Sequence, residues 1–265
     1  MKYTLGFIGC GNMGGALVRA AAKSVNGNEI AVCDYDANKA ATLANECGVV
    51  ATDAETLVKN SKFVVLGVKP QNMQETLAPL ATAIQNNADC VIITMAAGLS
   101  IAAIRKYVGK DLPVIRIMPN TPATVGEGMI LYVTCDVNAT DETAFLTAFA
   151  KAGKFDKIPE DKIDAASALS GCGPAYVYAF AEALADGAVA CGVPRDKAAL
   201  YAAQTLKGAA EMLLTFGHPA DLKDAVCSPG GTTIAGVHAL ENGGFRGVTM
   251  DAVTAAYKRT LELKK

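Results

Sequence analysis

The sequence predicts an α/β protein whose first part is a doubly wound parallel sheet and whose last part is entirely helical. Short apolar runs alternate with helical patterns up to about Ile158, and almost no strand pattern follows Asp161. The early strands are near-continuous runs of Val, Ile and Leu, which is typical of strands that helices cover on both faces. Strands and helices that take turns along the chain indicate parallel pairing. We therefore expect two domains, residues 1–160 and residues 161–265.

The predicted strands of the first domain are short apolar runs bounded by turn residues. They are Tyr3–Ile8, Glu29–Cys33, Lys62–Val68, Cys90–Met95, Val114–Met118 and Gly128–Thr134. The predicted helices between them are Asn12–Lys23, Asn38–Cys47, Gln71–Gln85 and a helix through Val108 that Ser100 caps. This alternation is the basis for expecting one sheet between two layers of helices.

The second domain is predicted to contain only helices. They are Pro174–Cys191, Asp196–Thr215, Ala220–Cys227, Thr232–Glu241 and Phe245–Lys264. Pro174, Pro194 and Pro219 stand at or near helix starts, where proline costs least. The first of these helices carries alanines on every side, so several neighbours can approach it closely. In such a small domain we expect some neighbours to come from a second subunit, as a homodimer, with a higher oligomer left open.

Composition narrows the functional classes. Hydrophobic residues make up 51% of the 265 residues, which allows a large buried core, and the net charge of −2 argues against a nucleic-acid surface. No apolar run of about 18 residues predicts a membrane span. The eight cysteines form no C-x-x-C pair, and only two histidines are present, so we expect no metal site. The first residues enter a strand without a signal-peptide pattern, which predicts a cytoplasmic protein.

A glycine-rich turn follows the first predicted strand and opens the first predicted helix. Gly9-Cys10-Gly11-Asn12-Met13-Gly14 fits G-x-G-x-x-G in the context that this motif requires. Its glycines and helix N-terminus are suited to the pyrophosphate of a dinucleotide. The candidate cofactor-binding residues here are Ile8, Gly9, Cys10, Gly11, Asn12, Met13 and Gly14. The alternatives are a tight turn without a ligand and, with less support, a flavin or S-adenosylmethionine site.

Asp34 lies at the end of the second predicted strand, about 20 residues after the glycine-rich turn. An acidic group at this position usually accepts from the ribose hydroxyls of NAD and repels the extra phosphate of NADP. The alternative is a solvated loop aspartate. No arginine follows nearby, although Asn38 and Lys39 are available to a phosphate. The pattern favours acceptance of NAD without excluding NADP.

Three later strand ends are expected to border the cofactor, because ligands lie at the carboxyl ends of parallel strands. The candidates are Val68, Lys69 and Pro70 after one strand, Ala96 and Ala97 after the next, and Asn120 after the third. The lysine suits a phosphate or ribose, the alanines leave room for a flat ring, and the asparagine offers an amide to the nicotinamide or the substrate. Each has an equally good alternative: an ordinary strand-to-helix turn for the lysine, a cramped helix contact for the alanines and a turn asparagine for Asn120.

A second glycine-containing turn, Ser228-Pro229-Gly230-Gly231-Thr232-Thr233, lies between two predicted helices. Gly230 and Gly231 permit unusual backbone angles, so that successive amides converge on an anion. Thr232 begins a helix whose dipole favours a carboxylate, and Thr233 offers a hydroxyl. The predicted substrate-binding residues are Ser228, Gly230, Gly231, Thr232 and Thr233. The alternative is a capped turn between two helices.

Several segments together resemble the pyrroline-5-carboxylate reductase family over essentially the whole chain. They are Phe7–Met13, Val68–Pro70, Met95–Gly98, Arg116–Pro122, Leu169–Tyr176 and, with the highest specificity, Asp224–Gly236. The resemblance implies a Rossmann domain, a helical dimerisation domain and the last step of proline synthesis with NADPH or NADH. It also implies that Thr233 bonds the ring nitrogen of the substrate and that Glu160 lies near the substrate. Asp34 departs from the small polar residue expected in an NADPH-preferring member.

The implied reaction is direct hydride transfer from the nicotinamide to the carbon of a cyclic imine. A protonated imine is already electrophilic, which fits a chain with no obvious catalytic histidine or lysine, so Thr233 is the candidate catalytic residue. A β-hydroxyacid dehydrogenase is the rival enzyme; it needs an acid or base such as Lys207 or Lys223 in the helical part. A non-catalytic dinucleotide-sensing dimer is the rival from another class.

Overall fold

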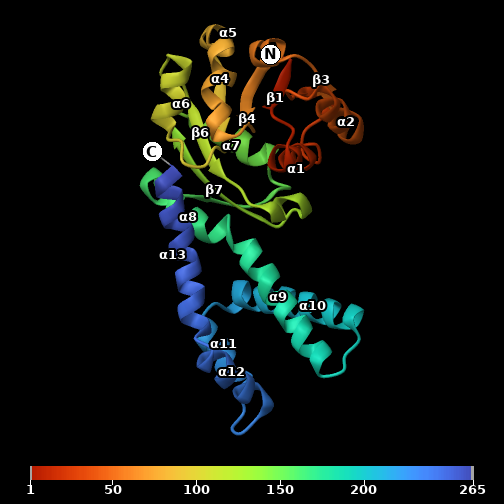
Figure 1. Cartoon of the computed structure of the whole chain (residues 1–265). Helices are drawn as coiled ribbons and strands as arrows, with labels where there is room; N and C mark the ends of the chain where they lie inside the picture. Colours follow the sequence, from red (N-terminus) through yellow and green to blue (C-terminus); the bar gives the residue numbers. More distant parts are fainter. Residues whose placement is uncertain (1, 264–265) are drawn as a thin grey trace. The chain divides into compact units, whose positions relative to one another are not determined.

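The computed structural model describes residues 2–263, and their contacts form two compact units (Figure 1). The sheet unit contains the described residues up to Cys172 together with those from Ala256 onward. The helical unit is Gly173–Ala255. These units divide after Cys172, whereas the predicted domains divide after residue 160, because helix α8 (Glu160–Ser170) packs on strand β7 of the sheet.

The described part of the sheet unit contains one sheet with the order β3-β2-β1-β4-β5-β6-β7-β8. The strands are β1 (Tyr3–Ile8), β2 (Ile30–Cys33), β3 (Val50–Ala51), β4 (Ser61–Leu66), β5 (Val91–Thr94), β6 (Val114–Met118), β7 (Gly128–Cys135) and β8 (Gly153–Lys157). The central order β3-β2-β1-β4-β5-β6 is that of a Rossmann fold, with its switch point between β1 and β4. The predicted doubly wound sheet is confirmed.

Strand β7 departs from the parallel pairing that the alternation of strands and helices indicates. All the pairs are parallel except β6 with β7, which are antiparallel. Only the short segment 119–127, with one turn of 3₁₀ helix, joins these two strands. Parallel neighbours need a crossover of a dozen or more residues, so this connection is too short for parallel pairing.

The helices of the sheet unit confirm the predicted alternation, although some of them were not predicted and one predicted helix is broken in two. They are α1 (Asn12–Ala21), α2 (Ala37–Cys47), α3 (Ala54–Asn60), α4 (Met73–Leu77), α5 (Ala81–Asn86), α6 (Ile101–Val108), α7 (Ala139–Ala148) and α8 (Glu160–Ser170). The single helix predicted over residues 71–85 is broken into α4 and α5 by a 3₁₀ turn, Ala78–Leu80. Pro79 lies in that turn, and proline cannot donate the hydrogen bond that a continuous helix needs there.

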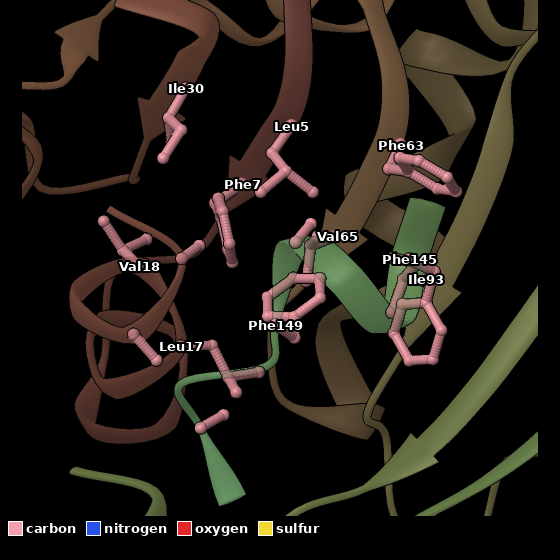
Figure 2. Close-up of a cluster of buried hydrophobic side chains, with 14 of the residues drawn as sticks. Leu5, Phe7, Leu17, Val18, Ile30, Phe63, Val65, Ile93, Phe145 and Phe149 are labelled. Atoms are coloured by element: carbon pink, nitrogen blue, oxygen red, sulfur yellow. The ribbon is translucent and has the colours of Figure 1, made fainter. Parts of the chain in front are cut away.

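The core has two layers because successive side chains of each strand point to opposite faces of the sheet. Leu5 and Phe7 of β1 pack with α1, α2 and α7 on one face. Ile8 of the same strand packs with α3 to α6 on the other face. Figure 2 shows the first layer, in which Phe149 points toward Phe7 and the side chains of α1. Both faces are therefore covered, as the continuous apolar strands predict.

The helical unit buries much less apolar surface of its own. It contains α9 (Gly173–Ala190), α10 (Arg195–Phe216), α11 (Pro219–Ala225), α12 (Thr232–Asn242) and the first part of α13 (Phe245–Leu263). Helices α9 and α10 pack through Ala185, Ala198 and Ala202. Large apolar side chains of this unit stay exposed, among them Tyr178, Leu200, Leu214, Phe216 and Met250. None of the described helices combines the length and the hydrophobicity that a bilayer span needs.

Replacing Phe149 by Ala should lower the free energy of unfolding by about 3–5 kcal/mol, because a cavity forms where the ring was. The ring is 1% exposed and lies 6.1 Å from that of Phe7 and 5.6 Å from that of Phe145, between centroids. Tyr35 is the control, since its side chain is fully exposed and Tyr35→Ala should change stability by less than about 0.5 kcal/mol. Urea denaturation followed by circular dichroism measures both. Equal stability of the two variants would contradict the role of Phe149 in the core.

Candidate active site

The glycine-rich turn lies at the switch point of the sheet. Gly9 directly follows β1, and its N–H donates to the carbonyl of Cys33 at the end of β2, at 2.8 Å. The N–H of Gly67, after β4, donates to the carbonyl of Ile8, also at 2.8 Å. The turn is thus joined to both neighbouring strands at the edge where this fold binds nucleotides.

The three glycines of the motif have different surroundings. Gly9 has a φ of +105°, and a Cβ there would lie 2.7 Å from the backbone of Gly67. A Cβ on Gly14 would overlap the carbonyl oxygen of Gly9. A Cβ on Gly11 would meet nothing within 4 Å. The first and third glycines are therefore required by the protein's own packing, whereas the second keeps space open for the close approach of a ligand.

Helix α1 begins at this turn without a side-chain cap. Gly11 is its N-cap, no side chain accepts a hydrogen bond there, and the first turn contains no acidic residue. The N-terminal amides and the positive end of the helix dipole are thus available to an anion such as a pyrophosphate. Together with the open space at Gly11, this fits a dinucleotide.

A cleft of about 710 Å³ opens beside the turn. Of the predicted cofactor-binding residues, it is lined by Ile8, Gly9, Gly11, Asp34, Val68 and Lys69. Cys10, Gly11 and Asn12 line a neighbouring hollow of about 380 Å³. Met13, Gly14, Pro70, Ala96, Ala97 and Asn120 line neither. The sequence analysis missed Thr52, Asp53 and Ala54 in the cleft, because strand β3 before them is only two residues long.

The Asp34 carboxylate joins the end of β2 to the glycine-rich turn. Its Oδ2 accepts from the N–H of Cys10 at 2.6 Å, and its Oδ1 accepts from the N–H of Asp36 at 2.9 Å. Burial, with a contribution from the Asp34 charge, raises the pKa of the Cys10 thiol to about 11. Cys10 therefore stays a neutral thiol at physiological pH, and a nucleophilic role for it is unsupported.

Asn120 has protein partners at both ends of its side-chain amide. Its Nδ2 donates to the carbonyl of Ser170 at 2.8 Å, and its Oδ1 accepts from the N–H of Met129 at 3.0 Å. These bonds tie the loop after β6 to the end of α8 and the start of β7. A contact of this amide with nicotinamide or substrate stays a prediction.

A buried arginine, which the sequence analysis did not single out as a site residue, holds α8 against β6. Arg116 is 2% exposed, and its Nη2 bonds Asp164 Oδ1 at 2.6 Å. Its Nη1 lies 3.4 Å from Oε1 of Glu160, which also accepts from the N–H of Ile101 at 2.8 Å. The sequence feature that could have identified Arg116 is a single charged residue inside the apolar strand Val-Ile-Arg-Ile-Met. Glu160 thus positions the start of α6, and its predicted contact with a substrate stays a prediction.

The second anion-binding candidate lies in the helical unit, at the start of α12. Gly230 has a φ of +68°, in the left-handed region that glycine favours. A Cβ on Gly231 would overlap the hydroxyl of Ser228, and Gly231 is the N-cap of α12, again without a side-chain cap. Thr232 and Thr233 form the first turn of α12 with exposed side chains. The N–H of Gly231 donates to the carbonyl of Ser228 at 3.0 Å, so the amides in the first turn of α12 are the ones left for a small anion.

No metal-binding cluster is present in the part of the chain that the structure describes. No three His, Cys, Asp or Glu side chains within residues 2–263 converge as ligands.

The Rossmann sheet, the glycine-rich turn and the open cleft define a dinucleotide-binding protein, and the comparisons place it among the NAD(P)H-dependent oxidoreductases. The family model "NADP oxidoreductase coenzyme F420-dependent" matches residues 4–98, and the model "Pyrroline-5-carboxylate reductase dimerisation" matches residues 160–263. The second match identifies the C-terminal helices as a dimerisation domain.

Full-length relatives specify the family further. Pyrroline-5-carboxylate reductase of Pisum sativum is 42% identical over 99% of this chain and 96% of its own length, and that of Escherichia coli is 37% identical over the whole of both chains. The chain belongs to the pyrroline-5-carboxylate reductase family.

Solved structures of this family have the same fold over the full chain. The enzyme of Coxiella burnetii has a TM-score of 0.90 at 32% identity and covers 100% of both chains. The enzyme of Plasmodium falciparum, solved with NADP bound, has a TM-score of 0.87 at 31% identity and covers 99% of this chain and 98% of its own.

The different surroundings of Gly11 and Gly14 predict opposite effects of the same substitution. Gly11→Ala should keep the melting temperature and weaken dinucleotide binding by about tenfold or more, because the methyl group occupies the ligand's space. Gly14→Ala should lower the free energy of unfolding by about 1–3 kcal/mol through overlap with the Gly9 carbonyl. Calorimetric titration and thermal denaturation separate the two effects. A Gly11→Ala variant with unchanged affinity would argue against a pyrophosphate at this turn.

The buried ion pair predicts a large cost for removing one partner. Asp164→Ala should lower the free energy of unfolding by about 3–5 kcal/mol, since the Arg116 charge is left buried without its carboxylate. Asp161 is the control on the same helix; it is exposed and pairs only with exposed Lys162, so Asp161→Ala should cost less than about 0.5 kcal/mol. Denaturant unfolding measures both. A cost for Asp164→Ala no larger than the control would contradict the holding role of Arg116.

Proposed function

We propose that this chain reduces 1-pyrroline-5-carboxylate to L-proline with NADH or NADPH. The observation that carries the proposal is the full-length match to reductases of this name, joined to a glycine-rich turn whose second glycine faces open space. The reaction needs one site for a dinucleotide and one for a small carboxylate, because both reactants must be bound at the same time. Each unit of the chain contains one uncapped helix N-terminus suited to one of these tasks.

We propose that the turn before α12 binds the substrate carboxylate. The left-handed Gly230 and the uncapped N-terminus of α12 direct backbone amides toward an anion. The proposed ligands are Ser228, Gly230, Gly231, Thr232 and Thr233. The hydroxyl of Thr233 is proposed to hydrogen-bond the ring nitrogen, which holds the imine in one orientation. Glu160 is also proposed as a substrate-binding residue, through Oε2, since Oε1 is engaged by Ile101 and Arg116.

The dihydronicotinamide, when bound, supplies a hydride for the imine carbon. The chain's contribution is to hold the cofactor at the glycine-rich turn and the ring at the second turn, and to exclude water from the reacting groups. Because a protonated imine is already electrophilic, no strong acid is required from the protein.

The alternative hypothesis, a β-hydroxyacid dehydrogenase, has little support from its two candidate lysines. Lys223 pairs with Asp224, and this hydrogen bond raises the pKa of its ammonium. A lysine with a raised pKa stays protonated and is a poor base for removing a hydroxyl proton. Lys207 lies exposed on α10. Oxidation of a hydroxyacid without any imine reduction would favour this rival, and dinucleotide binding without any turnover would favour a sensing dimer.

We further propose that the working form is a homodimer through the C-terminal helices, in the cytoplasm, with a higher oligomer still open. The exposed apolar side chains of α9 and α10 support the dimer, because a second copy would remove them from water. Neither a nucleic acid nor a membrane is proposed as a partner.

Thr233→Val tests the proposed substrate contact, because it keeps the shape of the side chain and removes the hydroxyl. With pyrroline-5-carboxylate, the expected kcat/KM falls by about 10- to 100-fold, the worth of a hydrogen bond to a charged group. Thr233→Ser should restore most of the activity. Thr147→Val, which removes an exposed hydroxyl on α7, is the matched control and should leave the rate unchanged. Oxidation of NADH and NADPH at 340 nm measures all four proteins; unchanged kcat and KM in Thr233→Val would remove the role of this hydroxyl.

A further inference from the structure

The connection between β2 and α2 lies where dinucleotide-binding folds distinguish NAD from NADP. Strand β2 ends at Cys33 and helix α2 begins at Ala37, so Asp34, Tyr35 and Asp36 form the whole connection. Asp34 and Tyr35 line the cleft beside the glycine-rich turn. These residues are therefore placed to face the group on the 2′ carbon of the adenosine ribose, which is a hydroxyl in NAD and a phosphate in NADP.

The backbone amides that would suit a 2′-phosphate already donate to side-chain or backbone oxygens of Asp34 and Asp36. The N–H of Asp36 donates to Asp34 Oδ1 at 2.9 Å, and the N–H of Asn38 donates to Asp36 Oδ1 at 3.0 Å. The N–H of Lys39 donates to the carbonyl of Asp36, also at 3.0 Å. Asp36 is the N-cap of α2, so the anion-binding end of this helix is filled from within the chain.

The charges near this connection also disfavour a phosphate. Asp34 and Asp53 both line the cleft, and hydrogen bonds from Thr56 lower the pKa of Asp53, which keeps it ionised at neutral pH. A 2′-phosphate carries close to two negative charges and would meet these carboxylates at short range. The nearest arginine in the adjoining hollow, Arg19, forms two bonds of 2.6 and 2.7 Å to Glu46 and is neutralised there.

The lysines that line the cleft offset the negative charge of its carboxylates only in part. Lys39 and Lys69 are the cations of the cleft lining, one after β2 and one after β4. Lysine is a strongly hydrated point charge and lacks the planar fork with which arginine holds a phosphate. An unmodified ribose hydroxyl, by contrast, is a donor. The Asp34 carboxylate has about four acceptor positions, of which two are used, so it still accepts such a donor.

Resting on the function proposed above, we propose that this chain prefers NADH to NADPH and that the Asp34 carboxylate is the specificity-determining group. Its charge, and the amides that it and Asp36 occupy, exclude the 2′-phosphate, while its free lone pairs accept from the ribose hydroxyl.

Calorimetric titration of the full-length protein with NADH and with NADPH tests this proposal without relying on turnover. The expected Kd for NADH is at least about tenfold lower than that for NADPH, because like charges at short range cost more than a kilocalorie per mole. The ratio of kcat/KM for the two coenzymes with pyrroline-5-carboxylate should show the same preference. The difference should shrink at high ionic strength, since salt screens a partly exposed carboxylate.

Asp34→Asn removes the charge and keeps the shape. It should tighten NADPH binding by about tenfold and weaken NADH binding several-fold. Asp36→Asn keeps a good N-cap residue and should improve NADPH binding to a smaller extent. Asp89→Asn removes an equal charge from an exposed position that does not line the cleft, and it should leave both affinities unchanged.

Asp34 also holds the turn at Cys10, so a melting temperature accompanies each titration. If Asp34→Asn unfolds, Asp36→Asn provides the same test. Equal or tighter binding of NADPH by the unsubstituted protein, or an unchanged ratio in a folded Asp34→Asn variant, would overturn the proposal. Imine reduction with an NADPH preference would overturn this proposal alone. A clear NADH preference in binding, without imine reduction by either coenzyme, would instead overturn the proposed function.

Discussion

Backbone packing at the carboxyl end of β1 is the constraint on which the cofactor site depends. Gly9 lies so close to Gly67 that no Cβ fits between them, and Gly14 lies still closer to the carbonyl of Gly9. Helix α1 can begin immediately beside the strand only because these side chains are absent. The free space is left at Gly11, and the uncapped amides of α1 face it. The Asp34 carboxylate then holds the turn through Cys10, so the turn geometry and the proposed cofactor selection share one side chain.

A buried charge connects the sheet with the first helix of the dimerisation domain. The family model for that domain begins at residue 160, yet α8 belongs to the sheet unit by its contacts. Arg116 explains this, because its guanidinium bonds Asp164 and lies near Glu160, while Asn120 binds the carbonyl of Ser170 at the other end of α8. A charge buried this deeply is tolerated only with its partners in place. The helix is therefore held at both ends.

Local patterns predicted most elements of the sheet unit correctly. Strands β1, β2, β4, β5 and β6 are continuous apolar runs, and the glycine-rich turn lies between strand and helix as its motif requires. The missed elements β3 and β8 are a two-residue strand and an edge strand of sequence Gly-Lys-Phe-Asp-Lys, neither of which has an apolar run. Helices α3 and α7 were missed as well, and so was the loop before α3, with Asp53.

The sequence by itself determined the class of fold, the places of the two glycine-containing turns and the family, because these depend on the local order of glycines, apolar runs and helix starts. Tertiary structure alone decided the direction of β7, the pairing of Arg116 with Asp164 and the hydrogen bonds that occupy Asn120. It also decided that Asp34 and Asp36 occupy the amides at the start of α2. Each of these outcomes depends on which atoms meet in space, and a linear pattern of residue types does not contain that information.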